Sequence, residues 1–148
     1  MKQNYSRDAV RQYLINNLDI VLDNPTMYGC IVERMSAEYD GDTFVDGDGY
    51  DQQNESTGVK KEVKSTNSPQ GGGPRFRINV GDAKYGSFDI LKIIDTCNNR
   101  VFEVPHDVFY SERSCSGNEF HWSASYGKND ARGVKVENTQ MLLKYEVV

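Results

Sequence analysis

Two acidic side chains and a lysine are spaced so that a β-hairpin would bring them together. Asp51 precedes a polar turn, and Glu62 and Lys64 lie on the hydrophobic-alternating run that follows the turn. Successive side chains of a strand point to opposite faces, so Glu62 and Lys64 share one face while Val59 and Val63 share the other. Pairing across the hairpin would place the Asp51 carboxylate beside that of Glu62.

The chemistry expected of these three side chains is metal-assisted hydrolysis of a phosphodiester. Two carboxylates that approach each other repel unless a positive charge lies between them. Mg²⁺ is commonly held by one or two carboxylates together with waters and phosphate oxygens, so Asp51 and Glu62 are predicted to bind Mg²⁺. An ammonium beside such a site can orient or help deprotonate the attacking water, or stabilise charge on the phosphate, which is the role predicted for Lys64.

Two alternatives stand beside this interpretation. Asp48 competes with Asp51 for the role of first carboxylate, although Asp51 gives the tighter hairpin with Glu62. The hairpin could also be a purely structural, solvated one with alternating charges.

The residues Gly49-Tyr50-Asp51, followed by Glu62-Val63-Lys64-Ser65-Thr66, resemble the PD-(D/E)-x-K nuclease superfamily. They are most similar to small type II restriction endonucleases or homing endonucleases, which carry Gly-x-Asp, a short polar turn and Glu-apolar-Lys-Ser. The literal Pro-Asp is absent. The glycine two residues before Asp51 matches the family spacing and favours Asp51 over Asp48. The resemblance further implies a restriction-endonuclease-like fold and a supporting metal-site role for Glu33, on the helix before the first active strand.

Hydrophobic spacing predicts the elements that must position these side chains. Apolar residues three and four apart predict an amphipathic helix over 6–22, capped by Ser6 or Asp8, and a second helix over about 26–39. Strands are predicted at 43–51, 59–65, 75–80, 87–94 and 100–104, with turns at 54–58 and 98–99, a loop at 67–74, a short helix or turn from 105, and a strand or short helix at 141–148. This order predicts an α/β (α+β) fold in which a central mixed β-sheet is flanked by helices.

The bulk composition predicts one globular domain spanning 1–148. The 148 residues are 37% hydrophobic and 26% charged, which is typical of neither a disordered nor a membrane-spanning chain. No apolar run approaches membrane-spanning length and no signal peptide is recognisable, so we expect a cytoplasmic (intracellular) protein without membrane association. Cys30, Cys97 and Cys115 are far apart and odd in number, which predicts free thiols rather than disulfides or a zinc site.

The positive charge of the chain is concentrated in one segment. The net charge is −5, which is unusual for a DNA-binding protein, but residues 59–84 carry six basic and two acidic side chains. Arg75 and Arg77 share one face of a predicted strand in this segment, where they can contact phosphates or a guanine edge. Lys84 extends the same positive segment. The alternative is that this segment is only a solvated face.

A second candidate for nucleic-acid contact lies further along the chain. Residues 111–130 interleave long hydrogen-bond donors with aromatic rings, a composition typical of nucleic-acid-reading segments. Arg113, Lys128 and Asn129 are the predicted contacts in this segment.

The function expected from these features is Mg²⁺-dependent endonucleolytic hydrolysis of double-stranded DNA, site-specific in the manner of restriction or homing enzymes. Cutting both strands with one site per chain calls for a homodimer or higher homo-oligomer, because the two DNA backbones are related by two-fold symmetry. The alternatives are a structure-selective resolvase or repair nuclease with the same chemistry, and a non-catalytic DNA-binding module.

Overall fold

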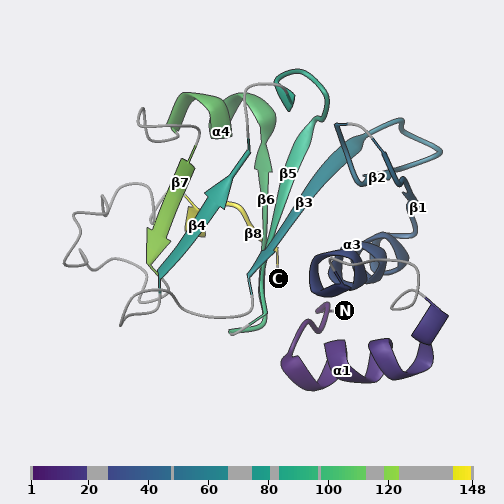
Figure 1. Cartoon of the computed structure of the whole chain (residues 1–148). Helices are drawn as coiled ribbons and strands as arrows, with labels where there is room; N and C mark the ends of the chain where they lie inside the picture. Colours follow the sequence, from purple (N-terminus) through teal and green to yellow (C-terminus); the bar gives the residue numbers. More distant parts are fainter. Residues whose placement is uncertain are drawn as a thin grey trace.

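A six-stranded mixed β-sheet runs through the middle of the molecule (Figure 1). The computed structural model describes residues 2–19, 27–47, 49–66, 75–80, 84–96, 98–112, 119–123 and 142–147. The strands of this sheet are β1 (Thr43–Phe44), β2 (Gln52–Gln53), β3 (Lys60–Thr66), β5 (Ile90–Asp95), β6 (Arg100–Pro105) and β8 (Glu146–Val147). They lie in the order β1-β2-β3-β5-β6-β8; β3 and β5 are parallel, and the other neighbours are antiparallel. The predicted α+β class with a central mixed sheet is confirmed.

Helices cover the two faces of this sheet. The helices α1 (Arg7–Asn16) and α3 (Met27–Asp40) lie together on one side, and α4 (His106–Glu112) lies toward the other (Figure 1). Side chains alternate along β5 and β6, so each of these two strands contributes to both cores, whereas β3 contributes Val63 to the α1/α3 side. The α1/α3 face buries Tyr5, Val10, Ile31, Val32, Met35, Val63, Ile94 and Val101, and the α4 face buries Val80, Phe88, Leu91, Ile93, Phe102, Val104, Phe109 and Leu142. No helix within the described ranges is long and apolar enough to cross a membrane.

The first predicted helix starts where expected, is interrupted by a turn at Asn17 and is helical again at residues 18–19, while residues 20–22 lie outside the described ranges. The Ser6 hydroxyl accepts a hydrogen bond from the Ala9 N–H at 3.3 Å, which confirms Ser6 as the N-cap. The helix ends at Asn16 because the Asn17 side-chain amide donates to the Tyr13 carbonyl at 2.8 Å and so competes with the helical backbone bond there.

The predicted continuous strand over 43–51 is wrong. β1 and β2 instead pair with each other, Thr43 opposite Gln53 and Phe44 opposite Gln52, so the chain reverses between them. Gly49 has a φ of +97°, a backbone conformation that favours glycine and cannot continue a strand. Asp51 therefore lies at the end of this loop, immediately before β2.

A separate two-stranded ribbon pairs β4 (Arg75–Asn79) with β7 (Glu119–Ser123). The strand predicted at 75–80 is confirmed, but its antiparallel partner comes from the segment that was expected to read nucleic acid. Arg75 lies opposite Ser123 and Arg77 lies opposite His121. The predicted loop at 67–74, together with Cys97 and Cys115, falls outside the described residues.

A buried ionic network joins α3 to three strands of the sheet. Asp40, the last residue of α3, accepts hydrogen bonds from Lys61 of β3 at 2.9 Å, Lys92 of β5 at 2.9 Å and Gln52 of β2 at 2.7 Å. Lys92 is fully buried. Burial opposes the charge of Asp40, but the Lys92 and Lys61 ammonium groups lower its pKa to about 2.

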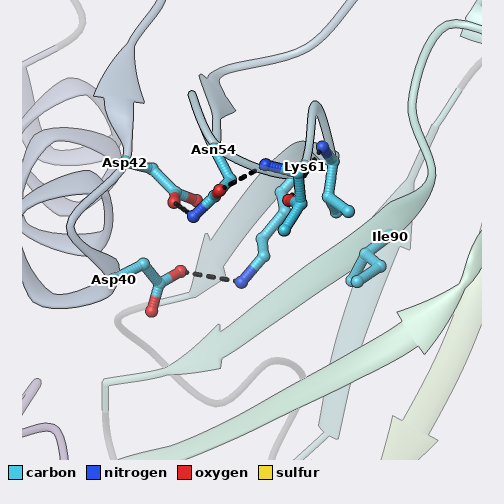
Figure 2. Close-up of a pocket in the computed structure, with 7 residues that line it drawn as sticks. Asp40, Asp42, Asn54, Lys61 and Ile90 are labelled. Atoms are coloured by element: carbon cyan, nitrogen blue, oxygen red, sulfur yellow. Dashed lines mark hydrogen bonds and ion pairs between the residues drawn. The ribbon is translucent and has the colours of Figure 1, made fainter.

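This network forms one wall of an open hollow of about 290 Å³ (Figure 2). Asp42, Asn54 and Ile90 line it beside Asp40 and Lys61. The Asn54 side chain donates to Asp42 at 2.9 Å, and Lys61 points toward Asp40. The polar side chains that line the hollow thus bond to one another, Asn54 to Asp42 and Lys61 to Asp40.

Replacing Asp40 tests the structural importance of this network. Asp40→Ala leaves the buried Lys92 ammonium without its carboxylate partner, so we expect the free energy of unfolding to fall by about 3–5 kcal/mol, measured by urea denaturation. Asp8→Ala is the matched control, because its ion pair with Arg11 is largely exposed and should leave stability near wild type. Equal stabilities of the two variants would contradict this account.

Candidate active site

Glu62 and Lys64 share one face of β3, as their spacing predicts. The Lys64 ammonium lies 2.6 Å from the Glu62 Oε1 atom. Glu62 is fully buried, whereas about a third of the Lys64 side chain is exposed, 31%. Burial opposes charge on Lys64, but the Glu62 carboxylate outweighs burial and raises the pKa of Lys64. Lys64 therefore stays protonated at neutral pH and acts as a hydrogen-bond donor.

Asp51 is held beside Glu62 by the backbone of β3. The Val63 N–H donates to Asp51 Oδ2 at 2.7 Å, and the Asp51 N–H donates to the Lys61 carbonyl at 2.9 Å. Burial and, after it, the Glu62 carboxylate raise the pKa of Asp51 to about 6. The structure thus brings together the two carboxylates that the hairpin predicted, while Asp48 lies outside the described residues.

Glu33 of α3 belongs to the same group of charges. Burial, followed by the Asp51 carboxylate, raises the pKa of Glu33 to about 7, although Lys64 and Lys84 act in the opposite direction. The neighbouring carboxylates therefore disfavour the ionisation of Glu33 and of Asp51, an effect that a bound cation relieves.

One oxygen of this group has no hydrogen-bond partner in the described part of the chain. Glu62 Oε2 is buried without a hydrogen bond, and such an atom is costly unless something binds it. No set of three or more His, Cys, Asp or Glu in the described ranges is arranged to hold a metal by protein atoms alone. Mg²⁺ usually takes only one or two carboxylates and completes its shell with water and phosphate oxygens. Glu62 and the neighbouring Asp51 fit that kind of site.

Lys84 contacts the site in a way that the sequence did not predict. It was assigned to the nucleic-acid surface, yet its ammonium binds the same Glu62 Oε1 atom that Lys64 binds. No regular spacing links Lys84 to Glu62, because the two residues are joined by a long connection that contains β4. Only the three-dimensional structure could reveal this contact.

The turn that carries Lys84 is anchored on α4. The Ser87 N–H closes the turn on the Lys84 carbonyl at 3.0 Å, and the Gly86 N–H donates to His106 Nε2 at 2.8 Å. The Tyr85 ring packs edge-on against His106, with ring centroids 4.8 Å apart. These contacts fix the backbone from which Lys84 reaches Glu62.

Gly49 couples this turn to the Asp51 loop. A Cβ atom on Gly49 would lie 2.7 Å from the Ser87 Cβ, closer than real Cβ atoms approach. The glycine of the Gly-x-Asp pattern is therefore required twice, by its positive φ and by the close packing of Ser87.

The remaining predicted nucleic-acid contacts are only partly located. The structure places the backbone of Arg75 and Arg77 in β4, paired with β7. Arg113, Lys128 and Asn129 lie outside the described residues.

Comparison with known proteins identifies the fold. No protein-family model and no curated protein matches the chain. Among solved structures, the chain is similar to a bacterial homing endonuclease, I-Ssp6803I, with a TM-score of 0.51 and 20% sequence identity; the match covers 83% of this chain and 86% of that one. At this identity the likeness shows a shared fold.

The raised pKa values of Asp51 and Glu33 predict how stability depends on pH. Between about pH 4, where these carboxyl groups ionise in an unfolded chain, and about pH 7, the folded state binds more protons. The free energy of unfolding of the metal-free protein should therefore fall as pH rises through this range. Urea denaturation in EDTA at several pH values should show a shallower decline for Asp51→Asn, whereas the exposed-site control Asp8→Asn should match wild type. Parallel curves for all three proteins would refute the assignment.

The packing of Gly49 gives a second prediction. Gly49→Ala should lower the free energy of unfolding by about 1–3 kcal/mol because of its positive φ, with an added cost from the Ser87 contact. Gly41→Ala is the matched control, since Gly41 also has a positive φ, +69°, but a Cβ there meets no atom within 4 Å. Adding Ser87→Gly should recover part of the loss in Gly49→Ala. No recovery in that double variant, measured by urea denaturation, would show that the close contact is unimportant.

Proposed function

We propose that the chain is a Mg²⁺-dependent endonuclease that hydrolyses phosphodiester bonds of double-stranded DNA. The observation that carries this proposal is the buried Glu62 carboxylate, which has one unpartnered oxygen, an adjacent Asp51 carboxylate and the Lys64 ammonium. The resemblance to the PD-(D/E)-x-K nucleases and the fold shared with a bacterial homing endonuclease support it.

Asp51 and Glu62 would hold the Mg²⁺, with Glu33 taking part directly or through bound water. When bound, the ion supplies a polarised water and stabilises negative charge on the phosphate. Since Glu62 is fully buried, its charge acts with little solvent screening. The backbone bond from Val63 to Asp51 Oδ2 fixes one oxygen of that carboxylate beside Glu62.

Lys64 acts as a donor in this proposal. Its raised pKa keeps the ammonium protonated, which favours orienting the attacking water and stabilising charge on the phosphate over proton abstraction. Its contact with Glu62 Oε1 places the ammonium directly at the proposed metal ligands.

The β4–β7 ribbon is the proposed DNA-contacting element. The major groove of B-DNA admits a two-stranded β-ribbon, and Arg75 and Arg77 lie on one strand of this ribbon. Arg113, Lys128 and Asn129 complete the proposed DNA contacts. We propose site-specific cleavage, of restriction or homing type, by a homodimer or higher homo-oligomer, because duplex DNA presents two symmetry-related backbones to one site per chain.

A plasmid-nicking assay tests this function. Supercoiled DNA should be cut with Mg²⁺ and left intact with EDTA. Lys64→Ala should lower the cleavage rate at least about 100-fold, the usual scale for acid–base or electrostatic groups, while DNA binding measured with Ca²⁺ stays near wild type. Lys60→Ala is the matched control on the same strand, since Lys60 lies over the Tyr50 ring.

Three outcomes would count against the proposal. Metal-independent cleavage would remove the role of Mg²⁺, and near-normal cleavage by Lys64→Ala would remove the role of Lys64. Cleavage of branched but not linear duplex would identify a structure-selective resolvase or repair nuclease instead.

A further inference from the structure

Two ammonium groups converge on one carboxylate oxygen at the candidate site. Lys64 and Lys84 both contact Glu62 Oε1, while Glu62 Oε2 is buried and binds none of the residues that the structure describes. Lys64 shares a strand with Glu62, whereas Lys84 comes from the anchored turn between β4 and β5. The second ammonium therefore reaches Glu62 from an independent part of the fold.

Lys84 is placed so that it can leave Glu62. Its side chain is 34% exposed, whereas Glu62 is fully buried. The turn beneath it is held by bonds from its own backbone and to α4, so only the side chain of Lys84 has to move. Its ammonium can thus turn to solvent, or to a phosphate, without disturbing the core.

The charges of the site do not accommodate both lysines and a divalent cation on the same carboxylate. In the metal-free protein, Lys64 and Lys84 offset part of the negative charge of Glu33, Asp51 and Glu62. A divalent cation bound to Glu62 would face two positive neighbours at contact distance, and like charges at that distance repel strongly. Releasing one of the two ammonium groups removes its share of this repulsion.

We propose, on the basis of the nuclease function above, that Lys84 is an exchangeable counter-ion of Glu62. It binds Glu62 in the metal-free protein, a divalent cation replaces it there, and the released ammonium then binds a phosphate of the DNA backbone. Metal and DNA consequently raise each other's affinity, since coupling between two ligands is reciprocal. Lys84 thereby links the occupancy of the site to the presence of substrate.

Direct titration of Mg²⁺ into DNA-free protein tests the exchange. Lys84→Met removes the competing charge, so Mg²⁺ should bind at least about fivefold more tightly than to wild type, within the usual range of coupling between sites. Lys84→Gln should do the same and guards against a packing fault in the methionine variant. Lys84→Arg keeps the charge and should remain near wild type. Lys60→Met is the control for removing a positive charge at another position. The Lys60 ammonium contacts the Tyr50 ring, 5.0 Å from its centroid, so its loss should leave Mg²⁺ binding unchanged.

A second titration measures the coupling itself. Ca²⁺ binding is compared with and without a DNA duplex. The duplex should raise the Ca²⁺ affinity of wild type and of Lys84→Arg, and should raise that of Lys84→Met much less.

The exchange is overturned if Lys84→Met and Lys84→Gln bind Mg²⁺ no more tightly than wild type, if Lys60→Met gains as much as they do, or if no protein binds Mg²⁺. The nuclease function is read separately from plasmid nicking. Absence of Mg²⁺-dependent nicking beside tighter Mg²⁺ binding by Lys84→Met would refute the function and keep the exchange.

Discussion

The pairing of Asp40 with Lys61 and Lys92 is the interaction on which the arrangement of this molecule depends. It joins the end of α3 to β3 and β5, and Gln52 extends it to β2. Gln52 directly follows Asp51 along the chain, and Lys61 directly precedes Glu62. The network therefore positions the backbone that carries Asp51 and Glu62.

β3 separates two groups of charges that behave in opposite ways. On the α1/α3 face, Asp40 is surrounded by donors, and although burial opposes its charge, the Lys92 and Lys61 ammonium groups lower its pKa to about 2. At the candidate site carboxylates outnumber the lysines, and the pKa values of Asp51 and Glu33 rise to about 6 and about 7. The first group is electrically satisfied by the protein itself. The second retains an excess of negative charge and an unpartnered oxygen, which is what distinguishes a ligand-binding group from a structural one.

Local patterns in the sequence predicted the parts of this fold that depend on neighbouring residues. Helical spacing located α3, the Asn54–Gly58 turn closed the hairpin, and strand alternation placed Glu62 beside Lys64. The reversal before Asp51 was missed because glycines in an Asp-Gly alternation were read as part of a strand. Lys61, on the α1/α3 face between Val59 and Val63, was not recognised as a partly buried ion-pair residue.

Contacts between distant segments could not be predicted from spacing. The β4–β7 pairing joins strands between which β5, β6 and α4 lie in the chain, and Lys84 approaches Glu62 from outside the hairpin. Neither contact corresponds to a periodic pattern in the sequence, because each depends on the tertiary arrangement of segments far apart in the chain. The sequence pattern Gly-x-Asp identified Gly49, but it could not predict that a side chain at Gly49 would collide with Ser87.

The N-terminal segment bears on the order in which the chain can fold during translation. Gln3 accepts a hydrogen bond from the buried Lys92 ammonium at 3.0 Å, and the Tyr5 N–H donates to Asn99 Oδ1 at 2.5 Å. Gln3 and Tyr5 therefore leave the ribosome before their partners, Lys92 and Asn99, which follow 89 and 94 residues later in the chain. Until β5 is synthesised, α1 and α3 cannot pack against it. Helices that form early therefore lack the core that stabilises them.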